Sequence, residues 1–145
     1  MQEYIDFFQQ NLILFLIWLS LFFALIVHFI KSYNILYKEI TTSEAVLLMN
    51  RENGIIIDIR SQDKFKKGHI INSVNILPLD LKKGNLGNLI NYKSRPIIVV
   101  CETGNSSKES AHLLIKSKFK KVNVLKNGLI AWKEDNIPLI SNNII

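Results

Sequence analysis

The pattern of apolar and polar positions divides the chain into two parts. From Leu12 to Ile30, only one serine and one histidine interrupt a run of nineteen residues. A helix of that length spans roughly 28 Å, which is enough to cross the hydrocarbon core of a bilayer. A cleaved signal peptide is the alternative, but the leader before the run contains Glu3 and Asp6 and no basic residue. The run predicts a retained membrane-spanning helix.

Beyond this run, the signals of strands and helices alternate. Apolar, largely β-branched runs predict strands at 55–59, 74–77, 97–100 and 122–125. Helical spacing and capping residues predict helices at 41–50, at 106–119 and from Gly128 through Trp132. Alternation of this kind is typical of parallel β-α-β units with right-handed crossovers. We therefore expect a small three-layer α/β domain.

These patterns also predict the boundaries along the chain. We expect a short extracytoplasmic leader at 1–11, a transmembrane helix at 12–30, a juxtamembrane linker at 31–38, a folded domain at 39–141 and a tail at 142–145.

The distribution of charge predicts an orientation in the membrane. All 18 Lys and Arg residues follow Ile30, so the positive-inside bias places the folded domain in the cytoplasm and the N-terminus outside. The formal net charge of +6 could indicate nucleic acid or an anionic membrane as partner. The lysines are scattered and are not interleaved with aromatic residues, so we expect no nucleic-acid binding. We expect solvated basic faces with some attraction to anionic lipid.

Cys101, the one cysteine of the chain, stands where a predicted strand ends and a predicted helix begins. Ligands of parallel α/β sheets bind beyond the carboxyl ends of the strands. A glycine-containing loop at this place can direct backbone N–H groups inward, and the helix N-terminus behind it favours a thiolate. The loop predicted to bind substrate comprises Glu102, Thr103, Gly104, Asn105, Ser106 and Ser107. We expect Ser106 or Ser107 to cap the helix. The alternative is a structural cysteine at a strand end.

Three segments carry a resemblance to a known family. They are VVCETGNSSKESAHLL around Cys101, IIIDIRSQDKFKKGHIINSVNILPL at 55–79 and VNVLKNGLIAWKEDNIPL at 122–139. In this order they resemble the single-domain rhodaneses, the thiosulfate and persulfide sulfurtransferases, over roughly residues 39–141. The resemblance implies a rhodanese-like three-layer α/β/α fold with a mainly parallel five-stranded sheet. Together with the apolar helix, the whole chain is similar to membrane-anchored bacterial rhodaneses, which implies the bacterial inner membrane.

The resemblance implies that Cys101 is catalytic. Its thiolate would take a sulfane sulfur from thiosulfate or a persulfide and pass it to a thiophilic acceptor, either a small molecule or a protein, while the loop amides stabilise the outer sulfur. Asp58 and Arg60 would orient the loop or brace the fold as an ion pair. His69 would have a structural role. No metal or other cofactor is expected, since His28, His69 and His112 show no ligand spacing with Cys101.

Two residues depart from the family pattern. Asn127 stands where the family often has glycine, and asparagine tolerates the left-handed conformation needed there. Glu102 places a negative charge beside Cys101, which would repel a dianionic donor such as thiosulfate.

Two other functions fit the same kind of fold. A phosphatase of this kind needs a loop one residue longer that closes with an arginine, whereas the sixth residue after Cys101 is Ser107 and no arginine follows Arg95. We therefore reject the phosphatase. A non-catalytic, membrane-tethered module that binds a partner stays as the alternative to sulfur transfer.

Overall fold

The computed structural model describes residues 11–33 and 36–141. The chain divides into two compact units, Met1–Ile35 and Leu36–Ile145. The expected tail at 142–145, all but the last residue of the expected leader, and residues 34–35 of the expected linker lie outside the described residues.

The first unit contains one long apolar helix, α2 (Leu12–Tyr33). Its stretch Leu12–Ile30 has a mean hydropathy of 2.7, and none of it is buried in the protein. A soluble domain rarely leaves so many consecutive apolar side chains uncovered. Length and composition make this helix a candidate membrane span. The helix continues to Tyr33, three residues into the segment expected to be linker.

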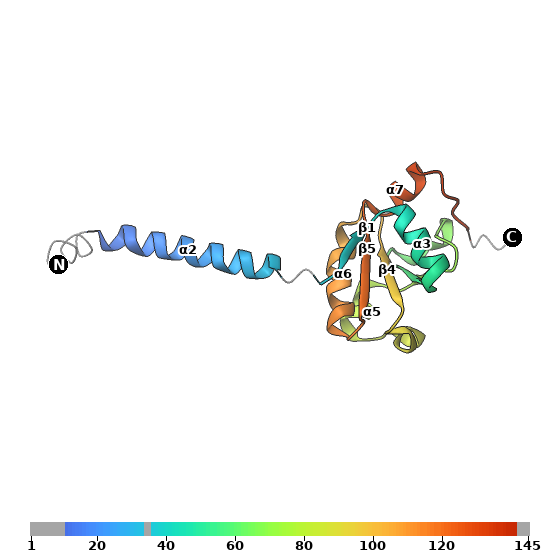
Figure 1. The fold of residues 1–145 in the computed structure, drawn as a ribbon, viewed down its shortest axis with the longest axis horizontal. Coiled ribbons are helices and arrows are strands. Elements are labelled where there is room, and N and C mark those ends of the chain that lie inside the picture. Colours follow the sequence, from blue (N-terminus) through green and yellow to red (C-terminus); the bar gives the residue numbers. More distant parts are fainter. Residues whose placement is uncertain (1–10, 34–35, 142–145) are drawn as a thin grey trace. The chain divides into compact units, whose positions relative to one another are not determined.

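The second unit is built on one parallel sheet of five strands in the order β1-β5-β4-β2-β3 (Figure 1). The strands are β1 (Lys38–Ile40), β2 (Ile55–Asp58), β3 (Val74–Asn75), β4 (Pro96–Val100) and β5 (Lys121–Leu125). All four strand pairings are parallel, so every strand has its carboxyl end at the same edge of the sheet. Strand β4 lies in the middle, and all five of its residues are buried.

Helices cover both faces of the sheet. They are α3 (Thr42–Glu52), α4 (Gln62–Lys67), α5 (Pro78–Lys83), the 3-10 helix η1 (Gly87–Tyr92), α6 (Asn105–Lys116) and α7 (Gly128–Glu134). Alternate strand residues enter two separate cores, as the period of two in a strand requires. Ile97 and Val99 pack with α5, η1 and α6 on one face. Ile98 and Val100 pack with α3 and α7 on the other. This is the expected three-layer arrangement.

The start of α3 shows how local sequence determines an element boundary. The Thr41 side chain accepts a hydrogen bond from the Glu44 N–H, and the Glu44 carboxylate accepts one from the Thr41 N–H at 2.9 Å. This reciprocal capping box satisfies two N–H groups that the first turn leaves without helical partners. The helix ends at Asn53, which adopts the left-handed conformation with φ 52°. The turn into β2 follows directly.

Several elements differ from the sequence expectation. The strand expected at 74–77 is limited to Val74–Asn75, because Pro78 begins the short helix α5. Strand β1 begins at Lys38, the last residue of the expected linker, and pairs with β5 at one edge of the sheet. Helices α4, α5 and η1 lie in segments for which the sequence pattern predicted no helix.

Candidate active site

Cys101 follows the carboxyl end of the central strand β4, at the junction with the loop that leads to α6. The residue is free of disulfides and only 5% exposed. It contributes to the wall of a hollow of about 320 Å³. The other residues that line the hollow are Ile59, Arg60, Ser61, Lys64, Pro78, Glu102, Thr103 and Ser106. Cys101 is therefore part of a small concave site beyond the carboxyl ends of the strands, where ligands of α/β folds bind.

The loop after Cys101 bends back over the sulfur. The Gly104 N–H donates a hydrogen bond to the Cys101 Sγ at 3.0 Å. Gly104 has a φ of +90°, which residues other than glycine rarely adopt, and this conformation turns the chain from the loop into α6. Helix α6 begins at the next residue, Asn105, so its first-turn N–H groups and dipole lie close to the thiol.

The expectation that Ser106 or Ser107 caps α6 is wrong. The cap residue is Gly104, and it makes no side-chain capping bond. The helix begins one residue earlier than predicted, which places both serines inside its first turn. Ser106 lines the hollow, whereas Ser107 is fully buried and its Oγ has no hydrogen-bond partner among the described residues. A glycine cap leaves the N–H groups of this turn free of a competing side-chain acceptor.

Helix α7 supports the loop through two backbone hydrogen bonds. The Leu129 N–H donates to the Cys101 carbonyl at 2.9 Å, and the Ile130 N–H donates to the Glu102 carbonyl at 3.2 Å. The approach is close because Gly128 has no side chain: a Cβ there would lie 2.3 Å from the Cys101 carbonyl oxygen. Asn127, one residue earlier, has φ 58°, the left-handed conformation expected for it.

Asp58 and Arg60 form a buried ion pair at the same edge. The Arg60 Nη2 donates to the Asp58 Oδ2 at 2.7 Å and to the Gly68 carbonyl at 2.6 Å, and its Nε also donates to Asp58. The Asn75 amide donates to the carbonyls of both Asp58 and Arg60 at 2.9 Å. Arg60 also lines the hollow at Cys101 and extends its Nη1 toward Glu102. Arg60 thus links its buried ion pair with Asp58 to Glu102 of the candidate loop.

Glu102 lies among three cations. Its carboxylate is 3.4 Å from Arg60, 3.5 Å from Lys133 and 4.0 Å from Lys64. Partial burial would raise the pKa of Glu102, but the charges of Arg60, Lys133 and Lys64 outweigh that effect and lower it. The side chain is 36% exposed and lines both the hollow at Cys101 and a second, adjoining hollow of about 370 Å³. Glu102 and the three cations around it therefore contribute together to the electrostatic potential near Cys101.

His69 is separated from the thiol site by its own contacts. Its ring stacks on Phe65 with centroids 3.9 Å apart, and its Nδ1 is 2.8 Å from the Phe65 carbonyl oxygen. Its backbone pairs with Ile140 in an isolated antiparallel bridge. It is absent from the residues that line the hollow at Cys101. This packing fits the structural role expected for it.

Lys64 and Lys133 are the charged residues around Glu102 that the sequence analysis did not single out, and the same holds for three further residues that line the hollow, Ile59, Ser61 and Pro78. Lys64 belongs to α4, an element that was not predicted, and Lys133 follows Trp132 on α7. Lys64 lies between Asp58 and His69, in one of the three segments that resemble the family. The basic residues of that segment were the signal from which its place in the site could have been predicted. The chain brings them to Glu102 only through the packing of two helices at the carboxyl edge.

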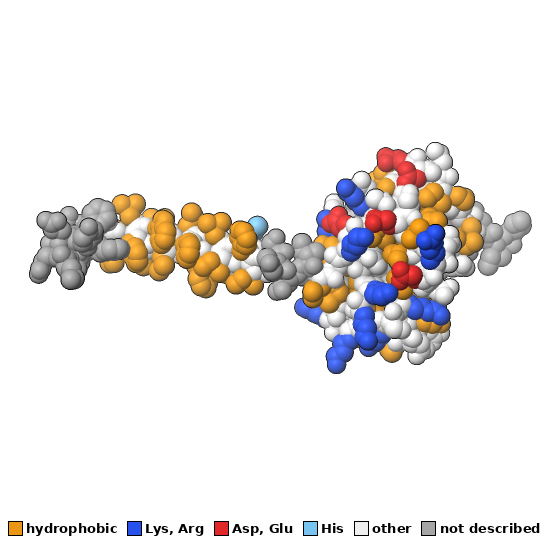
Figure 2. Space-filling view, viewed as in Figure 1, with side chains coloured by type: hydrophobic (Ala, Val, Ile, Leu, Met, Phe, Trp, Pro, Cys, Tyr) orange, Lys and Arg blue, Asp and Glu red, His pale blue; other side chains and the backbone are white. Residues whose placement is uncertain are grey.

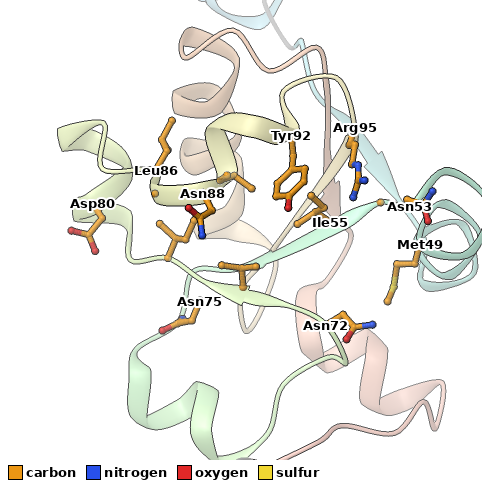
Figure 3. A pocket seen from close by; sticks show the side chains of 15 residues that line it. Met49, Asn53, Ile55, Asn72, Asn75, Asp80, Leu86, Asn88, Tyr92 and Arg95 are labelled. Carbon is orange, nitrogen blue, oxygen red and sulfur yellow. The ribbon is translucent and has the colours of Figure 1, made fainter.

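A larger hollow, of about 740 Å³, lies elsewhere and is lined by residues of β2 and β3, by the end of α3 and by the segment before β4. Figure 3 shows Tyr92 and Arg95 directed into it from the segment that precedes β4, with Asn53 and Met49 of the α3 end nearby. It contains neither Cys101 nor any loop residue of the candidate site. Among residues 11–33 and 36–141, no group of three or more His, Cys, Asp or Glu side chains could hold a metal ion.

Comparison with known proteins identifies the family to which the chain is similar. Residues 41–135 match the Rhodanese-like domain family. The chain is 40% identical over 140 residues to the uncharacterised protein YibN of Escherichia coli K12, covering 97% of this chain and 98% of that one. It is 31% identical over 103 residues to the thiosulfate sulfurtransferase GlpE of Coxiella burnetii, covering 68% and 89%. A rhodanese-related protein of Thermoplasma volcanium matches at a TM-score of 0.59 and 25% identity, covering 72% and 98%.

Proposed function

The chain belongs to the rhodanese-like domain family, and from that premise we propose that it is a membrane-anchored sulfurtransferase that acts through a persulfide on Cys101. Proteins of this family move sulfur between donors and acceptors. The observation that carries the proposal is the enclosure of the Cys101 sulfur by its own loop, with the Gly104 N–H at 3.0 Å and the α6 N-terminus behind it.

The chemistry proceeds in two balanced steps. The Cys101 thiolate attacks the outer sulfur of the donor, an S–S bond forms, and the donor leaves with the electron pair of the broken bond. With thiosulfate the leaving group is sulfite, and with a persulfide it is a thiolate. The acceptor, a thiolate or a similar nucleophile, then attacks the outer sulfur of the persulfide and restores the Cys101 thiolate.

The surroundings of Cys101 suit an intermediate with a charged outer sulfur. N–H groups at a helix N-terminus bind anions, and the dipole of the helix adds positive potential there. Arg60 and Lys64 line the same hollow and supply further positive charge, although Arg60 shares its charge with Asp58. Asp58 and Arg60 act in this proposal as positioning residues that hold the loop edge, and His69 acts only in folding.

The choice of donor depends on Glu102. Its carboxylate lines the hollow and opposes a dianion, whereas the three cations around it reduce that repulsion. A persulfide, which carries less charge than thiosulfate, meets a smaller barrier. We propose a persulfide, on a small thiol or on a protein, as the preferred donor.

The test is a comparison of wild type with Cys101→Ser. Incubation with a persulfide or thiosulfate donor should add the mass of one sulfur atom to the wild-type protein, and a thiol reductant should remove it. The Cys101→Ser variant should show neither the adduct nor sulfur transfer. Its free energy of unfolding should change by only about 1 kcal/mol, because the change in volume is small. Full transfer activity in Cys101→Ser would refute the mechanism.

A non-catalytic module that binds a partner is the second candidate function. The observation that favours it is the low exposure of Cys101, 5%, which limits access to a bulky acceptor. The same mass experiment separates the two, since a module that only binds would take up no reducible sulfur from either donor.

The anchoring part of the proposal rests on α2. Its uncovered apolar stretch Leu12–Ile30 is long enough to span a bilayer, and all Lys and Arg residues follow it. We propose that the helix is retained in the bacterial inner membrane, with the N-terminus outside and the rhodanese-like domain in the cytoplasm.

A further inference from the structure

The sheet has two chemically different edges, because all its strands are parallel. The carboxyl ends of the strands carry the Cys101 site. The opposite, amino edge is formed by the ends of helices α3 and α6 and by the residues that lead into β2, β4 and β5. In the orientation of Figure 1, α7 marks the carboxyl edge at the top, so the amino edge lies at the bottom of the folded domain.

The amino edge is strongly basic. The segments 51–53, 92–95 and 116–121 together contain seven Lys or Arg residues and one acid, Glu52. Six of the seven basic residues are exposed, and we call these six the basic edge: Arg51, Arg95, Lys116, Lys118, Lys120 and Lys121. In the view of Figure 2, several Lys and Arg side chains lie on the lower part of the domain, whereas the upper and middle parts show Lys and Arg together with Asp and Glu. Lys and Arg residues also lie at the carboxyl edge, among them Lys64, Lys66 and Lys133, so the amino edge is distinguished by having only one acid among its seven basic residues in these segments.

Little of the charge is neutralised within the protein. Among the described residues, the basic edge has one ion pair, between Lys121 and Glu52 at 3.0 Å. The Arg95 guanidinium lies over the Tyr92 ring, 4.8 Å from its centroid. Tyr92 is itself exposed, which places an amphipathic ring beside a cation at the rim of the 740 Å³ hollow. Tyrosine and arginine in this combination are suited to the headgroup region of a bilayer.

The chain reaches the domain beside this edge. Lys38 pairs with Asn123, two residues beyond the first residue of β5, so the segment before Lys38 runs alongside the start of β5. Leu36 lines one hollow together with Lys120 and Lys121 and is 70% exposed. Helix α2 ends at Tyr33, and the four residues between it and Lys38 reach at most roughly 18 Å. An anchored α2 therefore keeps the basic edge within a short distance of the headgroups.

From these observations we propose that the basic edge is a docking surface for anionic lipid headgroups in the membrane that holds α2. The inference rests on the proposed anchor, and it extends that proposal from a passive tether to a defined contact of the domain with the bilayer. Juxtamembrane basic residues each contribute about 1 kcal/mol of attraction to an anionic surface. Docking by the amino edge directs the opposite edge, with Cys101, away from the bilayer and toward soluble donors and acceptors.

Nucleic acid is the competing partner for a basic surface. Proteins that bind single strands interleave cations with several exposed aromatic rings on which bases stack. On this edge Tyr92 is the one exposed aromatic side chain among the described residues, and Phe119 is buried beneath Lys93. The short tether also favours lipid, because it fixes the surface near a membrane at all times.

The test uses the full chain in two kinds of lipid nanodisc, phosphatidylcholine alone and phosphatidylcholine with phosphatidylglycerol. Each lysine is labelled by a brief pulse of an acetylating reagent, and its labelling rate is measured by mass spectrometry. In the anionic discs Lys116 and Lys118 should be labelled several-fold more slowly than in the neutral discs. Lys66 and Lys126, which lie beyond the carboxyl ends of β2 and β5, should be labelled equally in both. Salt near 1 M, where the Debye length is about 3 Å, should abolish the protection.

A pair of double variants provides the matched control. Arg51→Gln/Lys120→Gln removes two charges from the basic edge and should weaken the docking equilibrium roughly 30-fold, which restores fast labelling of Lys116 and Lys118. Lys66→Gln/Lys126→Gln removes the same charge from the opposite edge and should leave their protection intact. All four positions are exposed, so neither variant should impair folding.

Three results would overturn the inference. Equal labelling of Lys116 and Lys118 in both discs, with the protein retained in them, would refute the docking surface and leave the anchor intact. Loss of the protein from the discs would refute the anchor and this inference with it. Protection of the same lysines by a single-stranded oligonucleotide in neutral discs, without any effect of anionic lipid, would assign the surface to nucleic acid. Sulfur transfer is measured separately and is independent of all three.

Discussion

At the scale of single residues, Glu102 determines the charge around the candidate thiol. The sequence shows an acid directly after Cys101, which by itself predicts repulsion of anionic donors. The structure adds Arg60, Lys64 and Lys133 within 4.0 Å of its carboxylate. Removal of Glu102 would therefore not only remove a negative charge but also leave Lys64 and Lys133 without their acidic partner, while Arg60 would keep its ion pair with Asp58.

We predict that Glu102→Gln lowers the KM for thiosulfate. At an effective dielectric constant near 20, a unit charge about 6 Å away contributes roughly 3 kcal/mol before screening, so after screening a decrease of about three- to tenfold is expected. Steady-state kinetics with thiosulfate and with an uncharged persulfide donor would measure it, and the second donor should respond much less. Glu52→Gln, the same change at the opposite edge of the sheet, is the control. An unchanged KM for thiosulfate would show that the carboxylate does not act on the donor.

The same residue should make stability depend on pH. The cations lower the pKa of Glu102 below its ordinary value of 4.5, so its charged form stabilises the folded state above that pH. This contribution is lost as the pH falls through the lowered pKa. Urea unfolding of wild type and Glu102→Gln should thus show a difference near pH 6 that narrows below about pH 4. A constant difference across this range would contradict the ion-pair network.

The residues of the site were predictable to different degrees. Cys101 was identifiable because it stands alone between a strong strand signal and a glycine-containing loop. Asp58 and Arg60 were placed at the same sheet edge, and their bond to each other is the brace that the sequence left open as an alternative. Lys64 and Lys133 were not predictable, since they reach Glu102 from helices distant in the sequence. The sequence pattern of surface lysines does not indicate which of them will contact an acid on another element.

At the scale of elements, Gly128 connects α7 to the loop of Cys101. We predict that Gly128→Ala destabilises the domain by about 3 kcal/mol or more, because a Cβ would lie 2.3 Å from the Cys101 carbonyl oxygen and φ is +57°. Gly84→Ala is the control for the backbone conformation alone. Gly84 has φ +75° with nothing within 4 Å of the added Cβ, so about 1 kcal/mol is expected. Urea unfolding measures both, and equal losses would show that the contact is not limiting.

Elements with a clear apolar run or helical spacing were predicted, including the two-residue strand β3 within the strand expected at 74–77, whereas β1, α4, α5 and η1 were not. Strands β2, β4 and β5 and helices α3, α6 and α7 follow from apolar runs and helical spacing. Strand β1 has three residues, Lys38–Ile40, of which Ile40 alone is buried, so no pattern of period two could reveal it. The cap of α6 was misassigned because serine is the commoner cap residue. The turn into α6 requires a φ of +90° at this position, which glycine adopts readily, so Gly104 is the cap residue.

At the scale of the whole molecule, the apolar run predicts one membrane span, and the one-sided basic residues predict its orientation. We predict that protease added to sealed right-side-out vesicles leaves the domain, residues 36–145, intact. The same protease should digest it when the vesicles are opened with detergent. Gel analysis with a C-terminal epitope measures both. Digestion of the domain in sealed vesicles would show that the orientation is opposite to the predicted one.

The bonds from α7 to the loop also have a consequence for synthesis. Cys101 is synthesised about thirty residues before Leu129 and Ile130. The N–H groups of these two residues donate hydrogen bonds to the carbonyls of Cys101 and Glu102. On the ribosome, therefore, the proposed anchor α2 and strand β4 emerge while the loop still lacks its support. The persulfide chemistry that we propose needs the complete surroundings of Cys101, and the order of translation delays their completion until α7 has emerged.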